Sequence, residues 1–454
     1  MWEVKNKRIL VIGAAKSGLA AASVLSRKGG LVTLTDIKSR EQLENHIKPL
    51  ETRGIELILG SDPEIYPGKY DFAVISPGVP LSIPLVKKLQ KVKIPLIGEL
   101  ETAYWYTKVP IVAITGTNGK TTTTALTGQI FNDAQIEAFI GGNIGIPLIT
   151  GVENLTKEKV VVAETSSFQL ETICNFRPKV AVIINITPDH LDRHGTMHGY
   201  TAAKARIFEN QQGSDFTVLN YDDPRTQALA KQSKAHVMFF SRKTILPQGV
   251  YIDRDQVVIN TGAKIINVVN CNDIYIKGGH NLENALAATA ASYCLGVDPQ
   301  SIGKTLKSFP GVAHRLEFVR NLIGVTYIND SKGTNPDATM KALEAYDRPI
   351  ILIAGGKNKG SDFKELAQLI RAKVRVLILL GEAAQAIREA VEKTGFSSIQ
   401  MVQDYPQAVS LANKVALPGD VVLLSPACAS WDMFHSFEER GDLFKSLVFK
   451  LSER

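Results

Sequence analysis

Short runs rich in valine, isoleucine and leucine alternate with longer segments of helical periodicity along this chain. Buried apolar runs that are separated by helices are typical of parallel β-sheets with helices on both faces, so we expect an α/β fold. At roughly 150 residues per domain, a chain of 454 residues has room for about three domains. Interruptions near residues 108 and 311 predict domains at 1–107, 108–310 and 311–454. Residues 237–276 are expected to form a small antiparallel addition.

The composition, 44% hydrophobic and 21% charged, is typical of a soluble globular protein. No apolar run reaches the roughly 18 residues that a membrane span needs, and the first residues lack the profile of a secretion signal, so we expect a cytoplasmic protein. The cysteines are too widely spaced to predict disulfides or structural zinc. The net charge of +7 is spread along the chain, which favours small anionic substrates over nucleic acid. We expect a monomer with no membrane partner.

A glycine-rich turn follows the apolar run at residues 111–114 and precedes a threonine-rich helix start. A strand, loop and helix in this order can cradle phosphate, so the segment predicts ATP binding. Lys120 would offset the charge of the β- and γ-phosphates, and Thr121 would hold Mg²⁺. Ile114 replaces the first glycine of the usual motif, and an ordinary glycine-rich turn is the alternative. The expected ATP-binding residues here are Gly116, Thr117, Asn118, Gly119, Lys120, Thr121 and Thr122.

Acidic and basic side chains follow the next predicted strands of the central segment. Glu164 ends one apolar run and is a candidate Mg²⁺ ligand, although a carboxylate after a strand can also cap a helix. His190, His194 and His198 are spaced by four residues, which could indicate zinc, but Gly195 interrupts the helix that such a site needs. We interpret His194 and His198 as surface residues. By its pattern alone, Lys204 would be a solvated helix lysine.

The first segment contains a partial dinucleotide-binding fingerprint. Residues 13–18 follow a predicted strand and open a helix, and Asp36 ends the next strand. Ala15 stands where the fingerprint has its second glycine. An NAD-dependent dehydrogenase is therefore an alternative for this segment, but it would leave the phosphate loop without a purpose.

The loop Gly-Thr-Asn-Gly-Lys-Thr-Thr resembles that of the Mur ligases, ATP-dependent enzymes that extend the peptide of the peptidoglycan precursor. The resemblance implies a Rossmann-like UDP-binding domain, a central P-loop ATPase-type domain and a C-terminal Rossmann-like domain. The Asp-His-Leu-Asp-Arg segment and the Tyr-x-x-Ala-Lys segment match family motifs. They imply a metal-binding His190, a Lys204 carbamylated by CO₂, and two Mg²⁺ sites. The implied catalytic residues are Lys120, Glu164, His190 and Lys204, and the implied metal ligands are Thr121, Glu164, His190 and Lys204.

The same resemblance implies residues for the uridylated substrate. Lys38 stands where we expect arginine, so a planar bidentate phosphate contact would be replaced by a point charge. The alternative for Asn143 is an ordinary Asn-Gly-type loop. The implied UDP-substrate residues are Ser17, Asp36, Lys38, Ser76, Gly78, Asn143 and His190.

The last segment resembles the branch of the family that adds D-glutamate, because residues 330–335 read Asp-Ser-Lys-Gly-Thr-Asn. That branch joins D-glutamate to UDP-N-acetylmuramoyl-L-alanine through an acyl phosphate. A P-loop kinase or ATPase and a nonenzymatic nucleotide sensor are the alternative functions. Lys357 is the alternative to Lys359 at the amino-acid site. The implied D-glutamate residues are Thr334, Lys359, Ser430 and Phe437, and the further ATP-binding residues are Asn281, Asn284, Arg315, Asp330 and Lys332.

Overall fold

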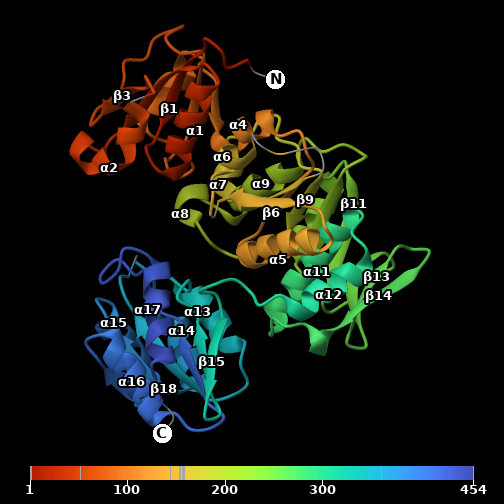
Figure 1. The fold of residues 1–454 in the computed structure, drawn as a ribbon, viewed down its shortest axis with the longest axis vertical. Helices are drawn as coiled ribbons and strands as arrows, with labels where there is room; N and C mark the ends of the chain where they lie inside the picture. Colours follow the sequence, from red (N-terminus) through yellow and green to blue (C-terminus); the bar gives the residue numbers. More distant parts are fainter. Residues whose placement is uncertain are drawn as a thin grey trace. The chain divides into compact units, whose positions relative to one another are not determined.

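The computed structural model describes residues 3–51, 53–143, 145–152, 155, 159–358 and 360–452. It divides into two compact units, Met1–Ile274 with Glu283–Phe309, and Tyr275–Leu282 with Pro310–Arg454. The first unit contains two sheets and the second contains one (Figure 1). The expected α/β fold is confirmed. The two sheets of the first unit lie on either side of residue 108 in the sequence, and the third begins after residue 311; the domain boundaries themselves stay predictions.

The first sheet has five parallel strands in the order β3-β2-β1-β4-β5. Its inner strands are buried along most of their length, as expected of a sheet covered on both faces. The strand order reverses direction at β1 and β4, and ligands bind at such points, beyond the carboxyl ends of the strands. The strands are β1 (Arg8–Ile12), β2 (Leu31–Asp36), β3 (Glu56–Leu59), β4 (Phe72–Ile75) and β5 (Leu96–Gly98), and the helices are α1 (Lys16–Arg27), α2 (Arg40–Glu51), α3 (Pro84–Lys91) and α4 (Glu99–Tyr106).

The second sheet has nine strands in the order β14-β13-β12-β11-β10-β9-β6-β8-β7. The strands are β6 (Ile111–Thr115), β7 (Ala138–Gly142), β8 (Val160–Glu164), β9 (Val180–Ile183), β10 (Phe216–Asn220), β11 (His236–Ser241), β12 (Gly249–Asp253), β13 (Gln256–Asn260) and β14 (Ile265–Asn270). The strands from β7 to β12 are parallel, so the loops after β6, β8 and β9 emerge at one edge.

The predicted antiparallel addition is smaller than expected. Only β12, β13 and β14 pair antiparallel, whereas β11, which lies inside the expected range, pairs parallel with β10. The chain reverses direction between β12 and β13 at Arg254 and Asp255. Both residues have positive φ, as a tight two-residue hairpin requires.

Helices cover the second sheet, and α5 packs against α12 (Figure 1). The helices are α5 (Lys120–Asp133), α6 (Leu148–Val152), α7 (Ser167–Leu170), α8 (Leu191–His194), α9 (Met197–Ala205), α10 (Pro224–Leu229), α11 (Gly279–Cys294) and α12 (Pro299–Ser308), with short 3₁₀ turns at Arg206–Phe208, Ala230–Gln232 and Cys271–Asp273. Helix α11 is rich in alanine, a strong helix former.

The second unit has a six-stranded sheet in the order β15-β16-β20-β17-β18-β19, in which only the edge pair β15–β16 is antiparallel. The strands are β15 (Glu317–Leu322), β16 (Val325–Asn329), β17 (Ile350–Gly355), β18 (Val374–Leu380), β19 (Ile399–Met401) and β20 (Val421–Leu424), and the helices are α13 (Pro336–Glu344), α14 (Lys364–Lys373), α15 (Ala384–Glu392), α16 (Tyr405–Val415) and α17 (Phe437–Phe449). Among the described residues, no helix is long and apolar enough to cross a membrane.

Candidate functional site

The glycine-rich loop joins β6 to α5, as the sequence predicts. Gly119 caps the helix with a φ of 82°, and a Cβ atom there would lie 2.2 Å from Oδ1 of Asn284. Only glycine combines this backbone conformation with so close an approach. The loop therefore places the amino terminus of α5 at the edge of the sheet, where backbone N–H groups and the helix dipole favour an anion.

The segment after β9 fixes the shape of this loop. Asn185 accepts a hydrogen bond from the Asn118 amide at 2.9 Å and donates back to the Asn118 carbonyl oxygen at 3.2 Å. The Thr117 hydroxyl donates to the Thr187 carbonyl oxygen at 3.1 Å and accepts from the Thr187 amide at 3.0 Å. Sequence reasoning missed Asn185 and Thr187, although their place just after an apolar run was a usable signal.

Two lysine side chains converge on one carbonyl oxygen of the loop. Lys120 Nζ and Lys204 Nζ donate to the Gly116 oxygen at 2.9 and 2.8 Å, and Lys120 also donates to the Thr117 oxygen at 2.8 Å. Lys204 is 1% exposed, so its interpretation as a solvated helix lysine is wrong. Its ammonium lies 4.6 Å from the centre of the Tyr200 ring. Burial, and then the charge of Lys120, hold the pKa of Lys204 well below its ordinary value.

Glu164 lies at the carboxyl end of β8, directly beside β6. Its side chain is 2% exposed. Oε1 accepts a hydrogen bond from Asn143 Nδ2 at 3.1 Å, whereas Oε2 is buried and has no hydrogen-bond partner among the described residues. The helix that follows is capped by Ser166, so the capping role considered for Glu164 is wrong. An anionic oxygen with no hydrogen-bond donor fits a cation ligand.

The two histidines after β9 have different surroundings. His190 is half exposed and adopts a left-handed backbone with a φ of 52°, and its Nε2 lies 3.5 Å from Asp189 Oδ2. His194 has a side chain only 3% exposed, so its assignment as a surface residue is wrong. It lies 3.0 Å from the Ser167 hydroxyl and 3.3 Å from Glu171 Oε1, and burial lowers its pKa. In the described part of the chain, no group of three or more histidine, cysteine, aspartate or glutamate side chains is arranged to hold a metal ion.

Two of the predicted UDP residues, Asp36 and Ser76, form hydrogen bonds with the turn after β1 in the first sheet. Asp36 accepts hydrogen bonds from the Ala14 amide at 2.6 Å and the Lys38 amide at 2.9 Å, and Ser76 Oγ donates to the Gly13 oxygen at 2.9 Å. Asp36 and Ser76 therefore shape the turn. Ser17 is half-buried beside it and Gly78 is exposed.

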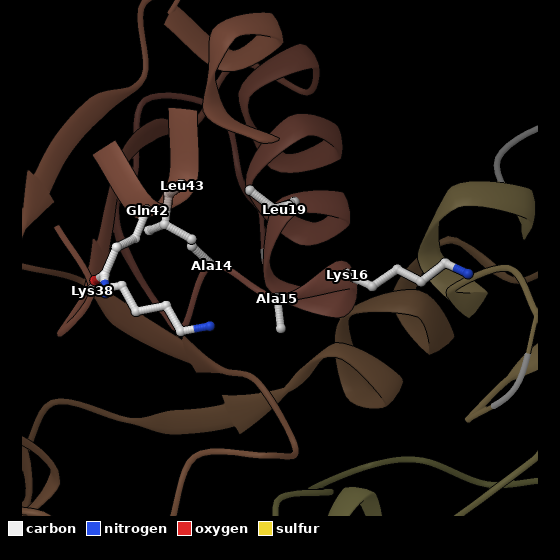
Figure 2. A pocket seen from close by; sticks show the side chains of 7 residues that line it. All are labelled: Ala14, Ala15, Lys16, Leu19, Lys38, Gln42 and Leu43. Atoms are coloured by element: carbon white, nitrogen blue, oxygen red, sulfur yellow. The ribbon is translucent and has the colours of Figure 1, made fainter. Parts of the chain in front are cut away.

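A cavity of about 470 Å³ opens at this turn (Figure 2). Lys38 and Gln42 lie on one side of it, while Lys16 extends away from the start of α1. Of the predicted UDP residues, only Lys38 lines this cavity. The lining residues are Ala14, Ala15, Lys16, Leu19, Lys38, Gln42 and Leu43.

In the second unit, the predicted nucleotide residues Arg315 and Asp330 lie close to each other. Asp330, at the end of β16, accepts hydrogen bonds from Ser425 Oγ at 2.7 Å and the Leu316 amide at 3.2 Å. Burial raises the pKa of Asp330 to about 6, although the hydrogen bond from Ser425 and the charge of Arg315 act to lower it. Asn281, at the start of α11, donates to the Lys277 oxygen at 2.8 Å within the same unit. Asn284 belongs to the first unit, where it accepts from Thr123 Oγ1 at 3.2 Å.

A buried guanidinium is connected through Ser331 to Phe437, one of the predicted D-glutamate residues. Arg440, 1% exposed, donates to Ser331 Oγ at 2.9 Å and to the Ser331 carbonyl oxygen at 2.7 Å. Ser331 Oγ in turn donates to the Phe437 carbonyl oxygen at 2.8 Å, and Lys332 Nζ lies 5.5 Å from the centre of the Phe437 ring. The sequence did not single out Ser331, and it gave Arg440 no role, because only the fold brings them together.

The remaining D-glutamate candidates are partly described. Ser430 is buried, and Thr334 is half-buried, with its amide 2.9 Å from the Lys332 oxygen. The backbone of Lys357 pairs in both directions with Ala429, next to Ser430. Lys359 lies outside the described residues, so the choice between Lys357 and Lys359 stays a prediction.

Comparisons with known proteins place these features in one family. Three family models match the chain: "Mur ligase MurD-like, N-terminal domain" at residues 7–98, "Mur ligase middle domain" at 114–292 and "Mur ligase, glutamate ligase domain" at 314–428. The chain belongs to the Mur ligase family.

The chain is also similar to individual proteins over nearly its whole length. The chain is 53% identical to the UDP-N-acetylmuramoylalanine–D-glutamate ligase of Pelotomaculum thermopropionicum, over 99% of this chain and 98% of that protein. It is 48% identical to the ligase of the same name from Clostridioides difficile, over 99% of this chain and 100% of that protein. The fold is similar to UDP-N-acetylmuramate-alanine ligase from Thermotoga maritima, with a TM-score of 0.59 at 18% identity over 98% of this chain and 99% of that one. It is also similar to MurF from Acinetobacter baumannii, with a TM-score of 0.61 at 19% identity. This match covers 98% of this chain and 94% of that one.

Proposed function

We propose that this chain is an ATP-dependent ligase that joins D-glutamate to UDP-N-acetylmuramoyl-L-alanine during peptidoglycan precursor synthesis. The observation that carries this proposal is the convergence of Lys120 and Lys204 on the phosphate loop. At the same sheet edge, Glu164 presents a buried carboxylate oxygen that accepts no hydrogen bond from any described residue. Near full-length relatives that carry the name of this activity support the choice of D-glutamate. We also propose that the protein acts as a cytoplasmic monomer with three domains at the predicted boundaries.

The reaction has two displacements. An oxygen of the alanyl carboxylate attacks the γ-phosphorus of ATP, and the bond to ADP breaks, which gives an acyl phosphate. The amine of D-glutamate then attacks the acyl carbon, phosphate leaves and the nitrogen loses a proton. Lys120 holds the transferred phosphoryl group and offsets the negative charge that accumulates on its oxygens. Because both steps join bound groups, much of the rate enhancement comes from positioning.

The residues present fit Mg²⁺ on one physical ground: the Oε2 atom of Glu164 is a buried carboxylate oxygen that accepts no hydrogen bond from the residues that the structure describes. Glu164 and Thr121 would hold the ion, which screens phosphate charge when bound. We propose a second ion at His190 and Lys204, with Lys204 carbamylated. The lowered pKa of Lys204 supports this, because the neutral amine is the form that reacts with CO₂. A carbamate would turn a cation that repels Mg²⁺ into an anionic oxygen ligand.

The substrates would bind to residues of different sheets. We propose that the cavity beside Lys38 takes the uridine diphosphate, with the remaining candidates Ser17, Asp36, Ser76, Gly78, Asn143 and His190. D-Glutamate would bind to Thr334, Lys359, Ser430 and the backbone at Phe437. The buried guanidinium of Arg440 is connected to the Phe437 carbonyl oxygen through the Ser331 hydroxyl, and this cationic network supports the placement for a dianionic amino acid.

Release of phosphate from ATP tests the proposal. The ligase should release ADP and free phosphate only when D-glutamate and UDP-N-acetylmuramoyl-L-alanine are both present. A kinase would instead leave a stable phosphorylated product, and a sensor would turn over no ATP. Faster release with L-glutamate or diaminopimelate than with D-glutamate would refute the assigned amine while leaving the family untouched.

A further inference from the structure

We propose that Arg193 is a positioning residue that holds the substrate loop of the first sheet, residues 76–78, against the segment that carries His190. This inference rests on the proposed function, because it concerns how two parts of that site are held together. Arg193 belongs to the Asp-His-Leu-Asp-Arg segment, but the proposed chemistry gives it no role.

Arg193 makes hydrogen bonds in two directions. Its Nη1 donates to the Pro77 carbonyl oxygen at 2.9 Å, which lies in the loop after β4. Its Nη2 and Nε donate to Glu171 Oε2 at 2.6 and 3.1 Å. The guanidinium also lies 4.1 Å from the centre of the Phe168 ring. The two charged side chains are only 15% and 16% exposed, so water screens this pair less than a surface ion pair.

Glu171 ties the same network to the His190 segment. Its other carboxylate oxygen lies 3.3 Å from His194 Nδ1, so one carboxylate contacts two adjacent residues of the single-turn helix α8. That helix begins directly after His190, whose left-handed backbone sets the direction in which α8 leaves. Glu171 is itself held by Arg206, which donates to its carbonyl oxygen at 2.5 Å. Glu171 therefore connects its own anchored segment to α8, the helix that follows His190.

The other end of the network reaches the UDP cavity. Pro77 follows Ser76, and Ser76 donates to the oxygen of Gly13 in the turn that borders the cavity. A continuous series of contacts thus runs from the cavity through Pro77, Arg193 and Glu171 to α8. A bound UDP substrate must extend from that cavity to the phosphate loop, so a shift between the two segments would misplace the reacting carboxylate.

The rest of the first unit should fold without Arg193. Glu101, on α4, accepts hydrogen bonds from the backbone amides of Cys174, Asn175 and Phe176 at 2.8 to 3.0 Å. The Gly98 amide also donates to the Thr172 oxygen at 3.0 Å. These contacts join the two sheets independently of Arg193, so its loss removes a local link and leaves the main connection between them.

The test compares Arg193→Gln with the control Arg225→Gln. Arg225 is an exposed residue on α10, a helix beside the second sheet. With ATP, D-glutamate and UDP-N-acetylmuramoyl-L-alanine, we expect Arg193→Gln to raise the KM for the UDP substrate about tenfold or more and to lower kcat. The KM for D-glutamate should stay within about twofold and the melting temperature within a few degrees. Arg225→Gln should match the wild type. Arg193→Lys keeps the charge but loses the planar fork, so it should recover only part of the loss.

Two outcomes would overturn the role of Arg193: a folded Arg193→Gln variant with an unchanged KM for the UDP substrate, or equal losses for all three substrates with a lowered melting temperature. A double variant with Glu171→Gln adds a second check. If the two residues act as one unit, the double variant should lose little more than Arg193→Gln alone, and additive losses contradict the network. A wild-type protein that fails to release phosphate with both substrates would instead refute the proposed function.

Discussion

The ammonium groups of Lys120 and Lys204 share the carbonyl oxygen of Gly116, at 2.9 and 2.8 Å. Two cations on one acceptor repel each other, and an anion that binds in the loop relieves this repulsion. Burial, and then this proximity to Lys120, lower the pKa of Lys204. One lysine is therefore suited to hold phosphate, and the other to exist as a neutral amine.

Replacement of Lys120 by alanine should abolish ligation. Its ammonium is the candidate cation for the transferred phosphoryl group, and removal of such a group typically costs at least about a hundredfold to a thousandfold in rate. Binding of the UDP substrate, measured by calorimetry, should persist because the cavity lies at the first sheet. Lys108→Ala, at an exposed position, is the control. Retained ligation, or loss of UDP-substrate binding, would contradict the assignment of the loop.

Lys204 should take up CO₂. The expected observation is a carbamate signal in an NMR spectrum recorded with isotope-labelled bicarbonate, because a lowered pKa enriches the neutral amine at a given pH. The signal should be absent from Lys204→Arg, which cannot form a stable carbamate, and should persist in Lys231→Arg, at an exposed position. Full activity of Lys204→Arg in CO₂-free buffer would argue against a carbamate in catalysis.

Glu164→Gln should weaken the response to Mg²⁺. The amide keeps the shape of the side chain and a partner for Asn143, but it removes the negative charge next to the unpartnered Oε2. We expect the Mg²⁺ concentration for half-maximal rate to rise, with kcat lower by about tenfold or more. Stability should stay equal or increase, since Oε2 is buried without a hydrogen bond from any described residue and a buried unsatisfied carboxylate oxygen is costly. Glu137→Gln, whose carboxylate is 69% exposed, provides the matched comparison.

The sequence predicts those parts of this architecture that depend on local pattern. Apolar runs located the strands, and the position of Glu164 at a strand end placed it beside the phosphate loop. The environment of His194 and Lys204 could not be predicted from residue type, because burial depends on which elements pack over a helix. The contact of Arg440 with Ser331 joins positions 109 residues apart, and no local signal encodes such a pairing.

The buried Asp330 should make the second unit less stable as the pH rises. Its pKa is raised from 3.8 to about 6, so the folded state binds more protons than the unfolded state between these values. The unfolding free energy should therefore fall by about 2 kcal/mol from about pH 4 to about pH 7, out of about 3 kcal/mol over the whole titration at roughly 1.4 kcal/mol per pKa unit. Asp330→Asn removes this dependence and adds a constant offset for a lost hydrogen bond. Hydrogen exchange of amides in β16 and β20 measures the unfolding free energy of this unit at each pH. Parallel pH profiles for the wild type and Asp330→Asn would exclude a contribution from Asp330.

Arg440→Lys should impair D-glutamate use while leaving the UDP substrate unaffected. Arg440 donates along three directions, to Ser331 Oγ, to the Ser331 carbonyl oxygen and to the Cys428 oxygen at 3.2 Å. A lysine ammonium cannot reproduce this planar arrangement, so the Ser331 hydroxyl and the Phe437 carbonyl oxygen that it contacts should shift. We expect the KM for D-glutamate to rise about tenfold or more, with the KM for the UDP substrate unchanged. Arg388→Lys, at an exposed position on α15, controls for the substitution itself. Equal increases in both KM values would show that Arg440 supports the stability of the whole protein rather than the amino-acid site.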